Sequence, residues 1–473
     1  MNRAGSCPTG RRKEMRIRKY DSGFSRRAFL EKSLKGVAAA GVLAPLWPEI
    51  ARSGTIDKVY PDELLSIELY TKGQVKPGDV ITADNVEVVK DLLDPIAYRQ
   101  VKEMGRRINI VETTTDVTKL FPHEYLEATL RNAGRAKFDA NGNVVTDDGK
   151  PWIGGNPFPN AQTGEEAFAN LTMSWGRHDE SVYGVRDWDI SPNGTLSYQY
   201  DFIWAEQNTV GLVNKPSPYQ AGAEDKLRYQ AVWFTSPTDA KGTAFLNTWH
   251  YDQRKFPELL GYLPAFKRVR NFPTNQRFEP LVPGITIFLS DAWAAGDPML
   301  TWGNYKVIGT KPHLGAVSGN WSGKTNPNWE REVHGGPQGQ TFFEDYKELV
   351  PEVLVVEAEP IGYPRAPVSK KRVYIDVRNM MFVSYLTYDR RGEIWKSFEP
   401  AFSQYKDGDA AYMDGAHPLW SWTHVHSHDV QTNRMSRFVQ AKQITGGFGP
   451  EYNIGPSIYD KYLTAQAIRR FGT

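Results

Sequence analysis

Cysteine is almost absent from this chain of 473 residues. The single one is Cys7, close to the N-terminus. Disulfides, thiolate metal sites and cysteine nucleophiles all require thiols, so these chemistries are excluded for the rest of the chain. For the same reason, no cysteine is available for acylation behind a signal segment.

Long hydrophobic runs and a strong charge excess are also lacking. No run of 18 apolar residues follows the N-terminal segment, so no membrane-spanning helix is predicted there. The chain has 57 basic and 55 acidic residues; residues 1–53 hold 12 and 4 of them, which leaves 45 and 51. The remaining net charge of about −6 predicts no nucleic-acid partner.

The N-terminal segment carries an arginine pair, Arg26 and Arg27, followed by an apolar run that ends near Leu46. This pattern resembles a twin-arginine export signal, whose route carries folded proteins. The alternatives are a chance arginine pair or a membrane anchor, although 34–46 is short for spanning a bilayer. We predict a signal-bearing region over 1–54, a single domain over 55–473 and a periplasmic location, with or without outer-membrane association.

Aromatic residues are abundant, with 14 Trp, 23 Tyr and 22 Phe, which favours broad β-sheet faces. The chain from Asp62 to about Leu130 reads as mainly helical. Helices are predicted over 86–93, 96–108 and 122–138, and a short helix opens at Thr163. A period of two residues then predicts about ten strands, including 197–204, 285–289 and 423–429, and a long loop over 309–339. The predicted fold is α+β, a large curved antiparallel sheet flanked by helices.

Two of these strands place aromatic side chains on one face. A concave sheet bearing them could line a pocket for a lipid or another apolar molecule, and burial of an acyl chain gains about 0.8 kcal/mol per methylene. The alternative is an inner face that packs only against helices. The predicted ligand-binding aromatic residues are Tyr198, Tyr200, Phe202, Trp204, Phe245, Trp249 and Tyr251.

Two arginines, Arg268 and Arg270, fall on one face of a predicted strand and could hold an acidic head group at the mouth of such a pocket. The alternative is that both belong to a solvated strand face.

Three histidines, His424, His426 and His428, share one face of a predicted strand. Imidazole ligates zinc, copper and nickel, so the strip is a candidate metal site. Neighbours on one strand face lie about 6.5–7 Å apart, so two of the three with a distant ligand would fit an ion more easily. The sequence has no serine-nucleophile elbow, phosphate loop or zincin motif, which disfavours an enzyme without excluding one.

Several short sequence motifs follow one another in a characteristic order between residues 80 and 440. The chain resembles the DUF1329 family of bacterial envelope proteins in the phrases Ile81-Thr-Ala-Asp-Asn-Val86, Gly164-Glu-Glu-Ala-Phe-Ala-Asn170, Leu263-Pro-Ala-Phe-Lys-Arg-Val-Arg270, Tyr388-Asp-Arg-Arg-Gly-Glu-Ile-Trp395 and Asp429-Val-Gln-Thr-Asn-Arg434.

The resemblance implies a fold like that of the outer-membrane lipoprotein carriers, an incomplete barrel closed by helices around an apolar cavity. It also implies a periplasmic carrier of a lipid or other hydrophobic compound, serving a transporter of the resistance-nodulation-division type. The histidine strip is not part of the resemblance, so a metal-dependent periplasmic enzyme stays as the alternative, and a divalent metal as its cofactor. A third alternative is an interaction subunit of a transporter complex.

Overall fold

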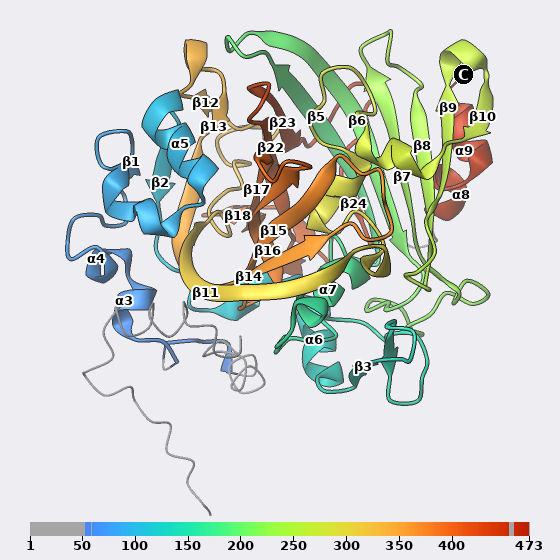
Figure 1. The fold of residues 1–473 in the computed structure, drawn as a ribbon, viewed down its shortest axis with the longest axis horizontal. Helices are drawn as coiled ribbons and strands as arrows, with labels where there is room; N and C mark the ends of the chain where they lie inside the picture. Colours follow the sequence, from blue (N-terminus) through green and yellow to red (C-terminus); the bar gives the residue numbers. More distant parts are fainter. Residues whose placement is uncertain (1–52, 58, 454–457, 473) are drawn as a thin grey trace, which may run out of the picture.

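The computed structural model describes residues 53–57, 59–453 and 458–472 (Figure 1). The predicted export residues Arg26 and Arg27, with nearly all of the region 1–54, lie outside the described residues. In the part that is described, no helix is long and apolar enough to cross a membrane.

A 16-stranded sheet dominates the described residues. It is open, because its end strands β1 and β10 each pair with one neighbour only, and every pair is antiparallel except β2 with β14. The predicted fold class is therefore confirmed, with more strands than expected. The strands in spatial order are β1 (Val80–Ile81), β2 (Ile108–Ile110), β14 (Asp345–Glu359), β15 (Val368–Asp376), β16 (Met381–Asp389), β17 (Ile394–Gln404), β22 (Trp420–Asp429), β23 (Arg434–Gln440), β5 (Glu180–Ile190), β6 (Leu196–Asn208), β7 (Lys226–Ser236), β8 (Ala244–His250), β9 (Glu258–Leu263) and β10 (Arg268–Asn271), with β11 (Gly303–Gly315) beside β14 and β24 (Glu451–Tyr452) beside β5.

Most of this sheet consists of two antiparallel meanders, β14 to β17 and β5 to β10, which the hairpin β22–β23 joins. The junction is the pairing of β23 with β5, for example Arg437 opposite Trp188. Segments some 250 residues apart in the sequence therefore form the middle of one curved sheet, between the orange and green strands of Figure 1.

The helices are short and lie around the sheet (Figure 1). Asp94 begins α5 by accepting hydrogen bonds from the N–H groups of Ile96 (2.9 Å) and Ala97 (3.0 Å), and Thr163 and Glu166 form a capping box on α7. The helices are α3 (Asp62–Leu65), α4 (Ile67–Tyr70), α5 (Pro95–Met104), α6 (His123–Asn132), α7 (Gly164–Met173), α8 (Tyr459–Tyr462) and α9 (Ala465–Phe471), and the 3-10 turns are η2 (Val86–Leu92), η3 (Val117–Leu120), η4 (Pro264–Phe266), η5 (Thr274–Phe278), η6 (Leu289–Ala294), η7 (Met299–Thr301) and η8 (Pro337–Gly339).

In the described part of the chain, four two-stranded ribbons lie outside the main sheet. They are β3 (Ala136–Phe138) with β4 (Val144–Thr146), β12 (Val333–His334) with β13 (Phe342–Phe343), β18 (Lys406–Asp407) with β19 (Ala410–Ala411), and β20 (Met413–Asp414) with β21 (His417–Pro418).

Several local predictions were wrong. The helix predicted over 122–138 ends at Asn132, because the chain turns into the β3–β4 ribbon. The helix predicted over 86–93 is instead the 3-10 turn η2, which ends at Leu92. The loop predicted over 309–339 begins inside β11. The strand predicted over 285–289 instead crosses the sheet, where the N–H of Thr286 donates to the hydroxyl of Ser436 at 2.8 Å.

Alternation along β17 defines two faces of the sheet. Phe398 and Pro400 point to the face that we call the inner face, whereas Glu399 lies opposite His426 on the outer face. Residues 287–294, which include η6 and which we call the covering segment, cover part of the inner face. The helices α8 and α9 pack on the outer face of β6 to β9. The inner face is where the predicted ligand pocket would lie.

Candidate functional site

An apolar cavity lies on the inner face of the middle strands. Its volume is about 110 Å³. A single water molecule needs only roughly 10–15 Å³. Ten of its 16 lining residues are aromatic and Asp291 is the one that is charged. The lining residues are Tyr183, Val185, Phe202, Trp204, Ile287, Asp291, Ala292, Trp293, Phe382, Tyr385, Phe398, Pro400, Phe402, Trp422, Val425 and Phe438.

The four predicted aromatic residues of β6 share the inner face. Phe202 and Trp204 line the cavity. Tyr200 is buried farther along, where its hydroxyl donates to the carbonyl of Pro283 at 2.8 Å, and Tyr198 stacks on it with 39% of its surface exposed. The row therefore runs from the cavity to the solvent edge.

The other predicted aromatic residues pack away from this cavity. Phe245 contacts Phe272 with ring centroids 5.7 Å apart. Trp249 is fully buried, with the Arg228 guanidinium 5.5 Å from its ring. Tyr251 follows the end of β8, and its hydroxyl donates to the carbonyl of Val144 at 2.5 Å. All three belong to neighbouring parts of the core.

The predicted head-group residues Arg268 and Arg270 lie on the edge strand β10. Both are exposed, and Arg270 sits over the ring of Phe266 at 4.2 Å. Neither lines the cavity.

Polar groups instead border the cavity from within the core. The Glu206 carboxylate accepts the indole N–H groups of Trp204 (2.5 Å) and Trp293 (2.9 Å), and burial raises the pKa of Glu206 to about 7. Asp291 pairs with Lys396 at 3.1 Å; burial raises the pKa of Asp291 and lowers that of Lys396 to about 8. Glu206 and Lys396 can therefore hold or release protons near neutral pH next to an apolar space.

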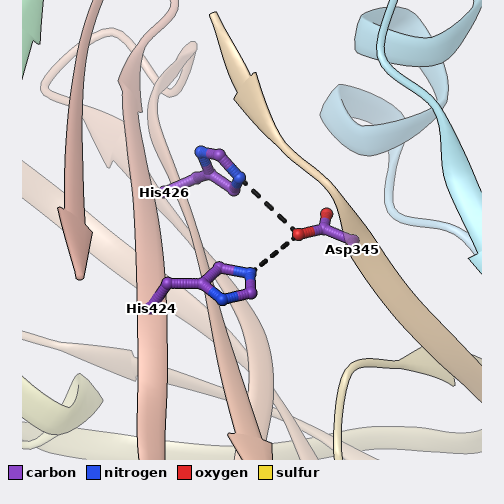
Figure 2. A group of neighbouring side chains, drawn as sticks. All are labelled: Asp345, His424 and His426. Atoms are coloured by element: carbon purple, nitrogen blue, oxygen red, sulfur yellow. Dashed lines mark hydrogen bonds and ion pairs between the residues drawn. The ribbon is translucent and has the colours of Figure 1, made fainter. Parts of the chain in front are cut away.

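Two of the three predicted metal-binding histidines converge on Asp345, the first residue of β14 (Figure 2). The Nε2 atom of His424 lies 2.9 Å from Asp345 Oδ1, and that of His426 lies 3.7 Å away. The third, His428, shares their face but contacts Gln100 (2.9 Å) and Asn433 (3.0 Å) instead.

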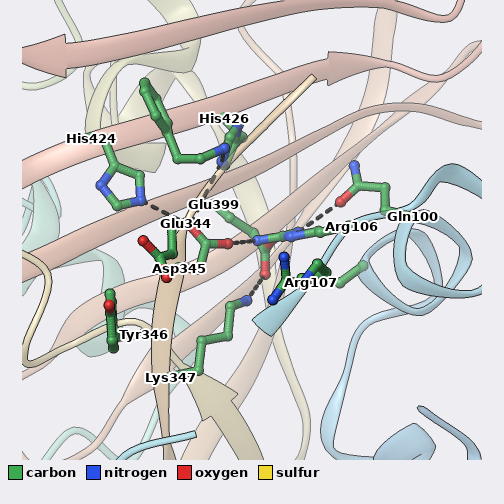
Figure 3. A network of polar contacts seen from close by, with 12 residues as sticks. Gln100, Arg106, Arg107, Glu344, Asp345, Tyr346, Lys347, Glu399, His424 and His426 are labelled. Atoms are coloured by element: carbon green, nitrogen blue, oxygen red, sulfur yellow. Dashed lines mark hydrogen bonds and ion pairs between the residues drawn. The ribbon is translucent and has the colours of Figure 1, made fainter. Parts of the chain in front are cut away.

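Asp345 also belongs to a buried ion-pair network (Figure 3). Arg106 pairs with both Asp345 and Glu399, and Lys347 pairs with Glu399, so two cations balance two anions. All four side chains are almost fully buried. Burial alone would raise the pKa of Asp345, but Arg106 and the hydrogen bond from His424 lower it overall, so the carboxylate stays ionised.

The histidines act in this network as neutral hydrogen-bonding groups. The N–H of Phe343 donates to Nε2 of His426 at 3.1 Å, which occupies the lone pair a metal would need. Burial lowers the pKa of His426 to about 4. A divalent cation would also face Arg106 and Lys347. The donor set therefore fits an ion-pair network better than a metal centre.

A family comparison decides the assignment of the chain. The model of the family described as "Protein of unknown function (DUF1329)" matches residues 80–469. The chain belongs to the DUF1329 family. This confirms the resemblance drawn from the sequence, and the family description itself names no activity.

The chain also has more distant similarity to solved structures. A putative outer membrane lipoprotein-sorting protein domain from Vibrio parahaemolyticus is 18% identical, with 63% of this chain and 93% of that chain covered and a TM-score of 0.40. A DUF1329 family protein from Desulfovibrio piger ATCC 29098 is 13% identical, with coverages of 64% and 97% and a TM-score of 0.42. A LolA superfamily protein from Nitrosomonas europaea is 13% identical, with coverages of 64% and 98% and a TM-score of 0.35. No curated protein matches the chain.

The sequence patterns indicated only Phe202 and Trp204 among the residues that line the cavity. Phe398 and Phe402 come from β17, and Trp293 comes from the covering segment near η6. The alternating apolar residues Phe398, Pro400 and Phe402 were the available signal for β17. Nothing local marks Asp345 as the partner of His424, because the two residues are 79 positions apart.

Proposed function

We propose that this protein is a periplasmic carrier that binds a hydrophobic molecule in the inner-face cavity. The observation that carries the proposal is the lining, which is aromatic and aliphatic except for Asp291. Such a wall stabilises apolar groups through burial and dispersion without any charged partner. Pockets that bind small molecules have this character, an apolar wall with few polar groups.

The ligand class follows from the size and cover of the cavity. The space of about 110 Å³ suits part of an acyl chain or a small ring system. A longer molecule requires the covering segment to move, and this segment holds Trp293 and Ala294 in the left-handed backbone region, with φ of 53° and 56°. Backbone in that region is costly for residues other than glycine. We place the entry route at this segment.

The proposal also includes an export route and a partner. Export by the twin-arginine route rests on Arg26 and Arg27, and the handover of cargo to a resistance-nodulation-division type transporter rests on the resemblance alone. To test the route, a reporter that fluoresces in the periplasm only when it is exported in the folded state is fused behind residues 1–54. The double variant Arg26→Lys, Arg27→Lys is expected to abolish the periplasmic fluorescence.

The alternative of a metal-dependent enzyme rests on Asp345, His424 and His426, whose ligand atoms lie within 4.8 Å of one another. The carrier proposal does not use these residues, so the two functions separate experimentally.

Binding of the neutral fluorescent probe N-phenyl-1-naphthylamine tests the carrier proposal. We expect saturable binding to the wild type and a loss of at least tenfold in affinity for Val425→Trp, which fills the cavity. Overpacking of this kind costs about 1–3 kcal/mol of stability, so the folded state is checked by circular dichroism. The matched control, Val333→Trp at an exposed position, should bind as the wild type does. Equal binding by both variants would refute the proposal.

A further inference from the structure

Among the described residues, five arginines are no more than 1% exposed, and three of them have carboxylate partners. Arg277 pairs with Asp297 at 2.7 Å, and Arg378 pairs with Asp376 and Glu348, each at 2.7 Å. Arg106 pairs with two acids in the network described above. The remaining two, Arg177 and Arg228, form no ion pair with any described residue.

Arg177 is the more extreme of the two. None of its three guanidinium nitrogens has a hydrogen-bond partner among the described residues, although the side chain is only 1% exposed. Its backbone lies in the left-handed region, with φ of 64°. Aromatic rings surround the charge: the centroids of Phe121, Tyr125 and Trp420 lie 5.3, 5.2 and 5.9 Å away. These rings offer a π face but accept none of the five N–H bonds.

Arg228 on β7 repeats the pattern. Its Nη2 donates to the carbonyl of Thr172, whereas Nε and Nη1 have no partner in the described part of the chain. Its guanidinium lies 4.3 Å from the ring centroid of Trp175. Glu206 attracts this charge from a distance without forming an ion pair.

Both charges act on the same residue, Tyr125 of α6. Burial raises the pKa of Tyr125 to about 12, and Arg177 and Arg228 oppose that rise. Other buried polar groups nearby also lack described partners, namely the indole N–H of Trp420 and the hydroxyl of Thr172. The region between α6, α7 and the sheet therefore holds several hydrogen-bond donors that no carboxylate of the described chain accepts. Uncompensated burial of a charge is strongly unfavourable, so a missing acceptor is the simplest account.

We infer that Arg177 and Arg228 bind an oxyanion, a carboxylate or a phosphate. The planar guanidinium suits both groups because it donates two parallel hydrogen bonds. The anion has two sources, a free inorganic anion or the head group of an amphiphile whose tail occupies the cavity. The second source rests on the proposed function.

The geometry places the anion site one layer of side chains behind the cavity wall. Trp420, which contacts Arg177, stacks on the cavity residue Phe402 with centroids 5.1 Å apart and planes 3° from parallel. Tyr183 lines the cavity, and its buried hydroxyl has no described partner. A Cβ atom added at Gly176, next to Arg177, would lie 2.1 Å from that hydroxyl. A head group bound by Arg177 and a tail in the cavity are therefore near neighbours.

Thermal shift and titration calorimetry with three probes test the inference: palmitate, 1-hexadecanol and inorganic phosphate. We expect palmitate or phosphate to stabilise the wild type, and Arg177→Met to lose at least tenfold in affinity for that anion. Hexadecanol, which lacks the charge, should bind both proteins within threefold. Arg177→Lys keeps the charge and should recover part of the anion affinity. The exposed Arg391→Met is the matched control and should bind as the wild type does.

The outcomes separate the two sources and the two proposals. Stabilisation by palmitate alone identifies the head group of an amphiphile, and stabilisation by phosphate identifies a free anion. If phosphate binds and neither long-chain probe does, the carrier proposal fails while the anion site stands. Two other results would overturn the anion site. The first is equal anion affinity of Arg177→Met and the wild type. The second is a lower melting temperature of ligand-free Arg177→Met with no anion binding by the wild type, which would indicate a packing role. If Arg177→Met does not fold, Arg228→Met provides the same comparison.

Discussion

The carboxylate of Glu206 on β6 accepts the indole N–H of Trp293 at 2.9 Å. This contact ties the covering segment to the sheet at one end of the cavity, because Trp293 belongs to η6 and also lines the cavity. A second indole, that of Trp204, donates to the same carboxylate oxygen at 2.5 Å. Protonation of Glu206 would weaken both hydrogen bonds, so the attachment of the covering segment depends on the charge of Glu206.

We expect the contribution of Glu206 to stability to fall as pH rises. Burial raises its folded-state pKa to about 7, above the ordinary value of 4.5, so the folded protein binds the extra proton between these limits. That contribution is fully present below about pH 4.5 and lost by about pH 7, on the order of 3 kcal/mol. Urea unfolding of the wild type and Glu206→Gln at pH 4.5 to 7.5 measures it, with Glu393→Gln as an exposed control. Parallel pH curves for the wild type and Glu206→Gln would contradict the assignment.

Enlarging the cavity should cost stability and extend the ligand range. Phe402 is 1% exposed and stacks on Trp420, so Phe402→Ala removes buried area and leaves a void, which typically costs about 3–5 kcal/mol. We expect a lower denaturant midpoint together with tighter binding of bulky apolar probes than in the wild type. Phe256→Ala, at a residue 39% exposed, should change neither quantity much. Loss of all probe binding in a folded Phe402→Ala would argue against this cavity as the ligand site.

The histidine group should behave as a structural network. We expect His424→Ala to lower the unfolding free energy by about 1–3 kcal/mol, because Asp345 loses a buried hydrogen-bond donor. Prolonged dialysis against a chelator should leave the melting temperature of the wild type unchanged. A stoichiometric metal ion measured by mass spectrometry in the wild type, and absent from His424→Ala, would reverse this conclusion and support the enzyme alternative.

Arg106 should be among the most sensitive positions of the fold. Its removal leaves Asp345 and Glu399 as buried carboxylates without their main partner, and breaking such a pair costs about 3–5 kcal/mol. We expect Arg106→Met to unfold at a much lower denaturant concentration. Arg99→Met, which breaks an exposed pair with Glu103, should cost less than about 1 kcal/mol. Similar costs for both variants would show that the network contributes little.

Arg268 and Arg270 should not contribute to ligand binding. Both are exposed on the edge strand β10 and neither lines the cavity. We expect the double variant Arg268→Gln, Arg270→Gln to bind palmitate with unchanged affinity. Weaker palmitate binding would restore the head-group role that the sequence suggested for them.

Local sequence patterns predicted what depends on neighbours along the chain. The period of two in β6 placed Phe202 and Trp204 on one face, and the same period placed His424, His426 and His428 together on the outer face of β22. The cap on α7 by Thr163 followed from residues three positions apart. Strand β5 was missed because Asp187 and Asp189 look like surface residues, although both are fully buried.

Only the tertiary structure decided which of these faces became a cavity and which charges found partners. The sequence alone determined the alternation of each strand, because that is a property of the backbone. Curvature of the sheet then brought β17 and β22 against β6, and left Phe245 and Trp249 in other parts of the core. Likewise, Arg106 pairs with Glu399 across 293 positions, while Arg177 pairs with no carboxylate of the described residues, since pairing across such distances depends on packing and not on spacing.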